Sequence, residues 1–257
     1  MRIPECLTLS ALPGIPLIRA GDDLAAIIIA AAARAKLEVS DGDIFVVAQK
    51  AVSKAQGRSV DLATVKPSSR SRALAAEVGK DPRLVEVILS ESVRVVRQRP
   101  GVLIVEHRSG WIMANAGVDQ SNVPAGAGAE PVLLLPEDCD GAAESLRAAL
   151  TTHFAKRLGV IINDSFGRPW RRGTIGVALG AAGIPALWNM RGQPDLNRRP
   201  LKVTETGFAD EVAAAASLLM GQADEGRPVV HVRGFAPSEA AIAAQALIRP
   251  AAEDLFR

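Results

Sequence analysis

The 257-residue sequence is poor in aromatic residues and in the side chains that bind zinc. Aromatic residues make up 4% of the chain, tyrosine is missing, and the cysteines are Cys6 and Cys139. Neither cysteine belongs to a CxxC motif or has a histidine at ligand spacing, so neither a zinc site nor a disulfide framework is expected. The core must therefore be built from Ala, Val, Leu and Ile.

Long apolar runs and an excess of one charge are missing too. The most apolar run, Leu24 to Ala33, is about half as long as a membrane-spanning helix. Residues 1–6 lack the apolar segment of a signal peptide, which favours a cytoplasmic protein with no membrane partner. The formal net charge is +2, and no block of Lys and Arg alternates with aromatics, so no nucleic-acid partner is expected either.

Apolar periodicity and turn residues predict an α+β protein of the mixed α/β type. The composition, with 48% hydrophobic and 23% charged residues, is that of an ordinary globular protein. Helices are predicted over 24–36, 82–90, 137–158 and 208–220, with an Ala-rich helix from Ser238 that breaks at Pro250. Strands are predicted over 44–48, 93–96, 102–106, 111–114, 159–162, 201–204 and 229–232, and loops over 115–131, 163–174 and 221–228.

Three glycine or serine motifs fail when their context is considered. Residues 221–226 have the glycine spacing of a P-loop, but Arg227-Pro228 replaces the required Lys and Ser/Thr. Residues 126–131 begin like a dinucleotide fingerprint but place Pro131 where the third glycine belongs. Ser165 follows a strand, as in a nucleophile elbow, yet the first glycine of that motif is replaced and no histidine has triad context. These motifs therefore indicate neither a Walker NTPase nor a serine hydrolase.

Two polar segments next to apolar strands combine acids, hydroxyls and amides. One runs from Ala114 to Asn122 and contains Asp119, and the other contains Asp164 and Ser165. Mg²⁺ is commonly bound by one or two carboxylates together with phosphate oxygens, and a serine hydroxyl is a frequent additional ligand. Aspartate is also a preferred turn and capping residue. The residue pattern alone leaves both interpretations open.

Six blocks spread along the chain resemble one known family. They are Gly21–Leu24, Asp41–Lys50 with Val52–Lys54, Gly79–Glu86, Ala114–Asn122, Asp164–Arg171 and Leu219–Gln222. In this order they resemble the coenzyme F420-0:L-glutamate ligase (gamma-glutamyl ligase) family. The resemblance covers residues 12 to 235, which makes it far more specific than any single motif.

The resemblance implies a homodimer with a family-specific fold of two parts and mixed sheets, with GTP and two divalent cations between the parts. The cations would be Mn²⁺ or Mg²⁺, and K⁺ is a further candidate. The implied reaction attaches L-glutamate to F420-0 at the expense of GTP through an acyl phosphate, with further gamma-linked glutamates as an option. Residues 1–257 would form a single ligase domain of two intertwined subdomains, without the C-terminal reductase-like domain that some relatives carry.

The family's site residues can be carried over by position. Asp119 and Asp164 match ligands of one cation, and Ser165 and Gln222 match ligands of the second. Asp119, Asp164 and Lys54 are the expected catalytic residues, since a phosphate needs a point cation such as Lys54. The expected nucleotide-binding residues are Ile15, Pro16, Leu17, Ile18, Gln49, Lys54, Asn122, Met220, Gly221, Gln222, Ala223, Asp224, Glu225, Gly226 and Arg227.

The sequence matches the family less closely at the expected substrate-binding residues and at one expected cation ligand. Arg168, Arg171 and Arg172 are expected to hold the acidic substrate, although an arginine in a loop is equally compatible with simple solvation. Relatives often carry a carboxylate where this chain has Gln222, and a neutral amide lowers the negative charge around the second cation.

Two other functions remain open at the level of sequence. The first is a metal-dependent nucleotide hydrolase, or a ligase that acts on a different acidic cofactor. The second is an inert relative that binds a nucleotide or a partner without catalysis. Product analysis distinguishes the first from the expected ligase, because hydrolysis releases phosphate without requiring glutamate. A metal titration tests the second.

Overall fold

A five-stranded sheet forms the centre of the molecule, in a computed structural model that describes residues 4–121, 130–236 and 240–255. Its strand order is β1 (Thr8–Ala11), β12 (Val229–Arg233), β2 (Ile44–Ala48), β8 (Gly159–Arg168) and β9 (Arg171–Ala182). Only β2 and β8 run parallel, and the other neighbours are antiparallel. The sheet is therefore mixed, in agreement with the predicted class.

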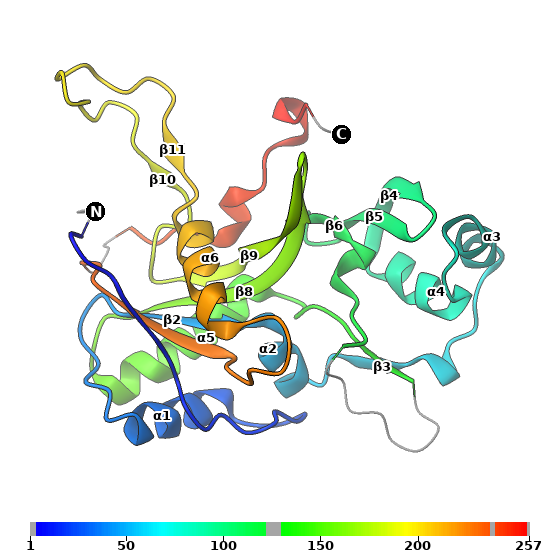
Figure 1. Ribbon diagram of the computed structural model, residues 1–257, viewed down its shortest axis with the longest axis horizontal. Helices are drawn as coiled ribbons and strands as arrows, with labels where there is room; N and C mark the ends of the chain where they lie inside the picture. The colour runs from blue at the N-terminus through cyan, green and yellow to red at the C-terminus, as the bar shows by residue number, and fades with distance from the viewer. Residues whose placement is uncertain (1–3, 122–129, 237–239, 256–257) are drawn as a thin grey trace.

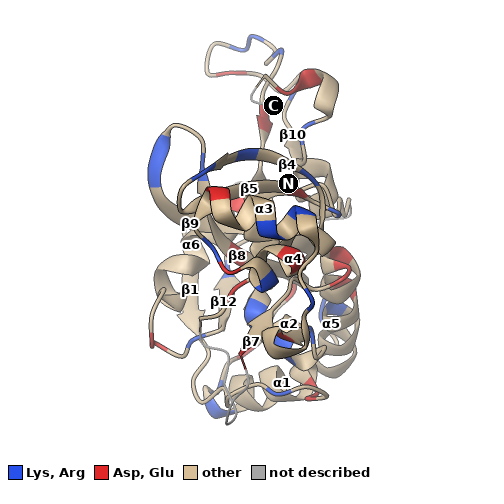
Figure 2. Ribbon diagram, turned by 90° about the vertical axis from the view of Figure 1, so that its right-hand side faces the viewer, with Lys and Arg blue, Asp and Glu red and all other residues tan. Residues whose placement is uncertain are grey.

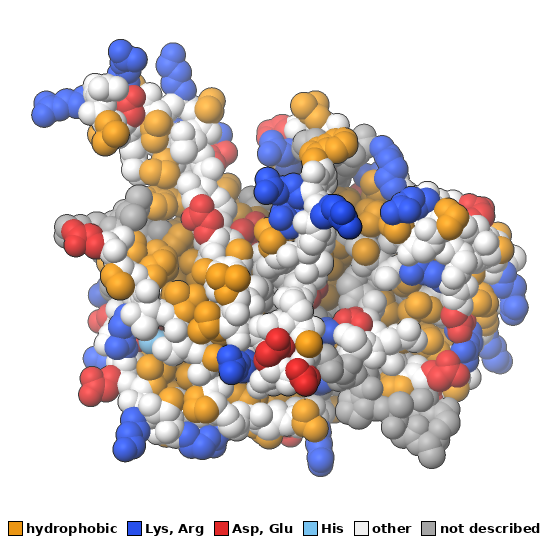
Figure 3. Space-filling model, viewed as in Figure 1, with side chains coloured by type: hydrophobic (Ala, Val, Ile, Leu, Met, Phe, Trp, Pro, Cys, Tyr) orange, Lys and Arg blue, Asp and Glu red, His pale blue; other side chains and the backbone are white. Residues whose placement is uncertain are grey.

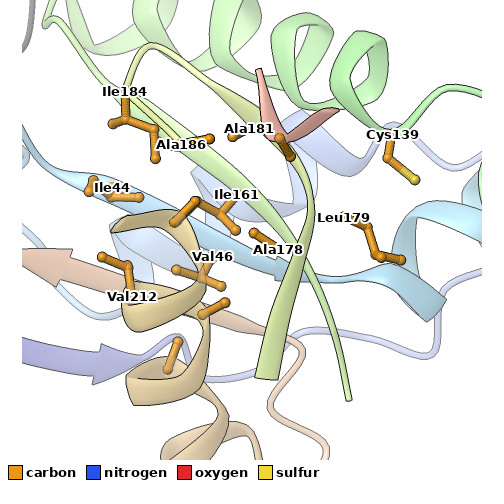
Figure 4. Packing of buried hydrophobic residues seen from close by; sticks show 14 of the residues in the cluster. Ile44, Val46, Cys139, Ile161, Ala178, Leu179, Ala181, Ile184, Ala186 and Val212 are labelled. Carbon is orange, nitrogen blue, oxygen red and sulfur yellow. The ribbon is translucent and has the colours of Figure 1, made fainter. Parts of the chain in front are cut away.

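Helices cover both faces of this sheet (Figure 1). Residues alternate along a strand, so Ile44 and Val46 of β2 pack with α6 (Phe208–Met220), as Figure 4 shows for part of this cluster. Phe45 and Val47 point to the opposite face, which is covered by α1 (Leu24–Arg34), α2 (Gln49–Ala55) and α5 (Cys139–Phe154). Both faces are buried, and this explains why β2 is a continuous apolar run.

A second part of the chain has its own core. It contains the antiparallel strands β4 (Ser92–Arg99), β5 (Val102–His107) and β6 (Ile112–Ala114) together with α3 (Ser69–Val78) and α4 (Pro82–Ser90). The strands β3 (Ser59–Asp61) and β7 (Pro131–Leu133) pair with each other where the chain enters and leaves this part. The sequence prediction of one domain with a soft internal boundary stays a prediction.

An arm projects from the central part (Figure 1). Its base is the strand pair β10 (Trp188–Asn189) and β11 (Glu205–Thr206), and residues 190–204 lie beyond it. The predicted strand over 201–204 is wrong, because the paired residues are Glu205 and Thr206. Short pairing of this kind is decided by the partner strand and not by β-propensity.

Two further sequence predictions are corrected by the structure. The predicted loop over 163–174 is mostly the long hairpin of β8 and β9, since its polar residues extend the pairing that starts in the core. The predicted tail helix is wrong over the described residues, which contain only the 3-10 turns η3 (Ala244–Leu247) and η4 (Ala251–Glu253). The tail instead makes a β-bridge between Ile242 and Pro185. Ser238 lies outside the described residues.

The remaining elements agree with the sequence more closely. The helix over 208–220 and the loop after it occur as predicted, and so does β2. The helices α2 and α3, the strands β1, β3, β7 and β10, and the 3-10 turns η1 (Leu62–Thr64) and η2 (Asn115–Gly117) were not predicted. Among the described residues, no helix has the length and apolar character needed to cross a membrane.

Candidate active site

A cavity of about 600 Å³ lies at one edge of the central sheet. The strand β2 ends here at Ala48, which pairs with Asn163 in the middle of its parallel neighbour β8. The strand β2 leads into α2, which supplies Gln49, Lys50 and Lys54 to the cavity wall. The loop between α6 and β12 and the segment 15–18 form the rest of the wall. Four separate parts of the chain therefore build the cavity.

Asp164 and Ser165 bring oxygen ligands from β8 into this cavity. The backbone amide of Ser165 donates to Oδ1 of Asp164 at 2.8 Å, and the Ser165 hydroxyl donates to Oε1 of Gln222 at 2.8 Å. Burial raises the pKa of Asp164 to about 6. The Ser165 amide and Lys50 act in the opposite direction, and the negative charge of Asp119 raises the pKa further. A carboxylate in this environment favours a bound cation.

Asp119 reaches the same region from the other part of the chain. Its backbone pairs with Leu133, and its carboxylate accepts hydrogen bonds from the amide and the hydroxyl of Ser121 at 2.7 and 2.9 Å. Nζ of Lys50 lies 2.5 Å from Oδ2 of Asp119. Burial raises the pKa of Asp119, but the bonds from Lys50 and Ser121 outweigh it and hold that pKa below the usual value. Asp119 does not line the cavity itself, but it is joined to it through Lys50.

The oxygen donors near the cavity fit a hard divalent cation better than zinc. They are two carboxylates, one hydroxyl and one amide, from Asp119, Asp164, Ser165 and Gln222. Within the part of the chain that the structure describes, no three His, Cys, Asp or Glu side chains gather into a metal site. Protein ligands alone would thus leave the coordination of Mg²⁺ or Mn²⁺ incomplete, and phosphate oxygens and water normally complete it.

The short helix α2 places two lysines on one face. Lys50 and Lys54 are four residues apart, which makes them neighbours on the helix surface. Burial lowers the pKa of Lys54, and the positive charge of Lys50 lowers it further. The same helix buries Gln49, whose Nε2 donates to the hydroxyl of Ser53 at 2.6 Å and to the carbonyl of Leu134 at 3.3 Å. The helix is thereby fixed to the segment that follows β7.

The loop after α6 forms the opposite wall. Gly221 has a φ of +72°, and a Cβ atom there would lie 2.1 Å from Cδ of Glu225. The Glu225 carboxylate folds back and accepts a hydrogen bond from the amide of Ala223 at 2.9 Å. Only glycine therefore allows this compact turn. The loop follows a helix and precedes a strand, which is the reverse of the order found in a P-loop.

Most of the predicted nucleotide-binding residues meet at this cavity. All of them line it except Asn122, which lies outside the described residues. The cavity also contains residues that the sequence analysis missed: Ala48, Lys50, Ala51, Asn163, Ser217 and Pro228. The spacing of Lys50 and Lys54 directly after a buried strand was a usable signal for Lys50.

The three predicted substrate arginines lie elsewhere. Arg168, Arg171 and Arg172 are at the tip of the β8–β9 hairpin, where basic residues are blue in Figure 2, and none lines the cavity. Arg168 donates to the carbonyl of Gly173 at 3.2 Å. Four residues of extended strand separate Arg168 from Asp164, a distance of about 13 Å. These arginines could therefore contact only a part of a ligand that extends well beyond the cavity.

Comparison with known proteins decides the family. Residues 14–234 match the family described as F420-0:Gamma-glutamyl ligase, and this match includes every wall of the cavity. The chain belongs to the F420-0:gamma-glutamyl ligase family.

Curated relatives are similar over almost the whole chain. A protein of Methanothermobacter thermautotrophicus is 44% identical over 98% of this chain and 99% of its own length. A protein of Methanopyrus kandleri is 46% identical over 93% of each chain, and one of Halorubrum lacusprofundi is 42% identical over 89% of this chain and 88% of its own. All three are named coenzyme F420:L-glutamate ligase. The family predicted from the six sequence blocks is confirmed.

Proposed function

We propose that this F420-0:gamma-glutamyl ligase family member joins L-glutamate to F420-0 in coenzyme F420 biosynthesis, with GTP as the phosphoryl donor. The observation that carries the proposal is one cavity that Lys54 lines together with the oxygen-bearing side chains of Asp164, Ser165 and Gln222. The proposed substrates come from the name coenzyme F420:L-glutamate ligase, which is given to relatives that are similar over nearly the full length of this chain. The cavity is the proposed binding site of the nucleotide.

An amide bond cannot form from a free carboxylate without activation. In the proposed reaction a carboxylate oxygen of F420-0 takes the γ-phosphoryl group of GTP, and GDP leaves. The glutamate amine then attacks the carbonyl carbon of the acyl phosphate, loses a proton and releases inorganic phosphate. Each step mainly requires alignment and neutralisation of phosphate charge.

The chain's own residues align the nucleotide and supply part of the positive charge that neutralises its phosphates. Lys54 presents an ammonium group to the phosphates, and the loop 220–227 and the segment 15–18 enclose the nucleotide. Asp119 and Asp164 would hold one divalent cation, and Ser165 and Gln222 the second. Mg²⁺ or Mn²⁺ bound there would neutralise charge on the transferred phosphoryl group. Because Ser165 and Gln222 are joined by a hydrogen bond, their oxygens already lie on one side of the cavity.

The basic hairpin tip is proposed to bind the acidic precursor. Arg168 ends the strand that carries Asp164, and Arg171 and Arg172 begin the paired strand β9, so a ligand held at the tip would reach the cavity by lying along this hairpin. A guanidinium group binds phosphate or carboxylate oxygens through paired hydrogen bonds. Asp164 and Arg168 are about 13 Å apart along β8, so one end of the precursor can lie at the arginines while its reactive carboxylate lies at the cavity.

The projecting arm supports the proposal of a homodimer. Leu196 is fully exposed near its tip and Val203 is 79% exposed, and the arm stands clear of the body in Figure 3. Apolar side chains on a projecting segment gain free energy when another surface covers them. A second copy of this chain is the proposed partner.

Product analysis tests the proposed reaction directly. The protein is incubated with F420-0, L-glutamate, GTP and Mn²⁺, and product masses are followed over time. We expect a glutamyl adduct of F420-0, with GDP and phosphate formed in step with it. Later adducts show whether further glutamates are added, and replacing GTP by ATP shows how strict the nucleotide preference is. Phosphate release that does not require glutamate would identify a nucleotide hydrolase instead.

A further inference from the structure

Lys50 binds a carboxylate that the proposed cation site requires. Its Nζ lies 2.5 Å from Oδ2 of Asp119 and donates a hydrogen bond of 2.6 Å to Oγ of Ser121. The Ser121 hydroxyl in turn donates to the same Oδ2 at 2.9 Å. The Lys50 and Asp119 side chains are 30% and 40% exposed, so water screens this ion pair only in part. Lys50 is therefore tightly associated with Asp119.

The position of Lys50 also connects Asp119 with the cavity. Lys50 lines the cavity together with Lys54 and Asp164, and its charge acts on both of them. Two lysines four residues apart repel each other on a helix unless anions lie nearby. The two lysines and two aspartates make up a nearly neutral group of four charges.

A divalent cation on Asp119 changes this balance. The cation and the Lys50 ammonium carry like charges and compete for the same carboxylate oxygen. An ammonium that leaves Oδ2 needs another anion, and nucleotide phosphates in the adjoining cavity provide one. The flexible four-carbon stem of lysine allows its ammonium to move between such partners.

We propose that Lys50 couples nucleotide binding to cation binding by releasing Asp119 when nucleotide phosphates attract its ammonium group. The inference rests on the proposed function, in which Asp119 is a cation ligand. Lys50 is then a positioning residue, since it acts on the cation through Asp119. Linkage requires that the nucleotide raise cation affinity by the same factor by which the cation raises nucleotide affinity. Lys50 contributes part of that factor.

The substitution Lys50→Met separates the two roles of this side chain, because it keeps the stem and removes the charge. Mn²⁺ binding is measured from the free-ion EPR signal, first with protein alone and then with a non-hydrolysable GTP analogue. Without nucleotide, we expect Lys50→Met to bind Mn²⁺ about fivefold more tightly than the wild type, the effect of removing a partly exposed competing charge. The analogue should then increase Mn²⁺ affinity by a smaller factor than in the wild type.

Three further variants make the result decisive. Lys50→Gln should behave like Lys50→Met, and Lys66→Met, which removes an exposed lysine outside the cavity wall, should bind Mn²⁺ like the wild type. If Asp119→Asn leaves Mn²⁺ binding unchanged, the proposed cation site is wrong and the coupling fails with it. If Asp119→Asn weakens Mn²⁺ binding but neither Lys50 variant tightens it, the cation site stands and the role of Lys50 is overturned.

Discussion

Individual side chains of this protein differ in how far their surroundings reveal their roles. Burial raises the pKa of the Asp164 carboxylate to about 6. Lys50 is the one cation whose charge lowers this pKa among the residues that the structure describes. Gln222 is an exposed residue of the cavity wall, and its Oε1 is oriented toward the cavity by the hydrogen bond that it accepts from Ser165. Both observations support cation binding, and each leads to a substitution that tests it.

Asp164→Asn should abolish ligation and leave the fold intact. The amide is nearly isosteric but supplies no negative charge to a hard cation. We expect turnover to fall by more than about 100-fold, as for loss of a metal ligand. Removal of a buried charge should leave the melting temperature at neutral pH equal to that of the wild type or higher. Near-normal turnover at saturating Mn²⁺ would exclude Asp164 from the cation site.

Gln222→Glu should tighten the second cation, because charge count is a main determinant of affinity for hard cations. The variant should reach half-maximal GTP turnover at a lower Mn²⁺ concentration than the wild type. Gln193→Glu adds the same charge on the exposed arm and serves as a control. Equal Mn²⁺ requirements of the Gln222 variant and the wild type would show that this side chain lies outside the coordination shell.

At the scale of elements, close packing and buried charges hold the site's strands in place. The hairpin of β8 and β9 carries Asp164 and Ser165, and it packs against α6 through glycine. Asp43, directly before β2, contacts the side chains of His231 and Arg233 in β12. Two predictions concern these contacts.

Gly176→Ala should destabilise the protein. A Cβ atom at position 176 would lie 2.4 Å from the carbonyl oxygen of Ala213 and 2.3 Å from Oγ of Ser217, both in α6. Forced overpacking of this kind typically costs about 1–3 kcal/mol. Gly167→Ala in the same hairpin is the matched control, because no atom lies within 4 Å of its added Cβ. Equal midpoints of urea unfolding for the two variants would contradict the close contact between β9 and α6.

Asp43 should make folding stability depend on acid pH. Burial raises its pKa, but His231, Arg233 and the Ser40 amide outweigh this and lower the pKa to about 2 from the usual 3.8. A depressed folded-state pKa stabilises the protein above pH 3.8, and this stabilisation is lost as the pH falls toward 2. The pKa shift of Asp43 corresponds to about 2 kcal/mol of folding free energy at neutral pH.

The variant Asp43→Asn checks this value. Urea unfolding at a series of pH values should show a large stability difference from the wild type at pH 7 that shrinks through the acid range. A difference that stays constant with pH would mean that the Asp43 charge does not stabilise the fold.

The molecule as a whole combines a central sheet, a second core and an exposed arm. Leu196→Asp should weaken the proposed homodimer while leaving the monomer folded, since Leu196 is fully exposed within the chain. Sedimentation velocity over a range of protein concentrations measures this effect. Val93→Asp, at another exposed apolar residue on β4, is the control. Unchanged association of the Leu196 variant would place the interface elsewhere.

The sequence alone determined the family and most of the central elements. Residues with strong local signals, such as the apolar run 44–48 and the helix 208–220 before Gly221, were predicted at their observed bounds. Three of the six family-like blocks contain cavity residues: Gln49 and Lys54 in one, Asp164 and Ser165 in another, and Met220 to Gln222 in the third. Both kinds of signal depend on neighbours in sequence, so no tertiary information was needed to find them.

Only the tertiary structure decided how distant segments meet. The long β8–β9 hairpin depends on pairing between strands, and the tail's Ala-rich composition did not make it a helix because its backbone is held against Pro185 and Ala186. The ion pair of Lys50 with Asp119 joins residues that no local pattern connects. Side-chain charge is encoded residue by residue, but the distance between two charged side chains is set by packing.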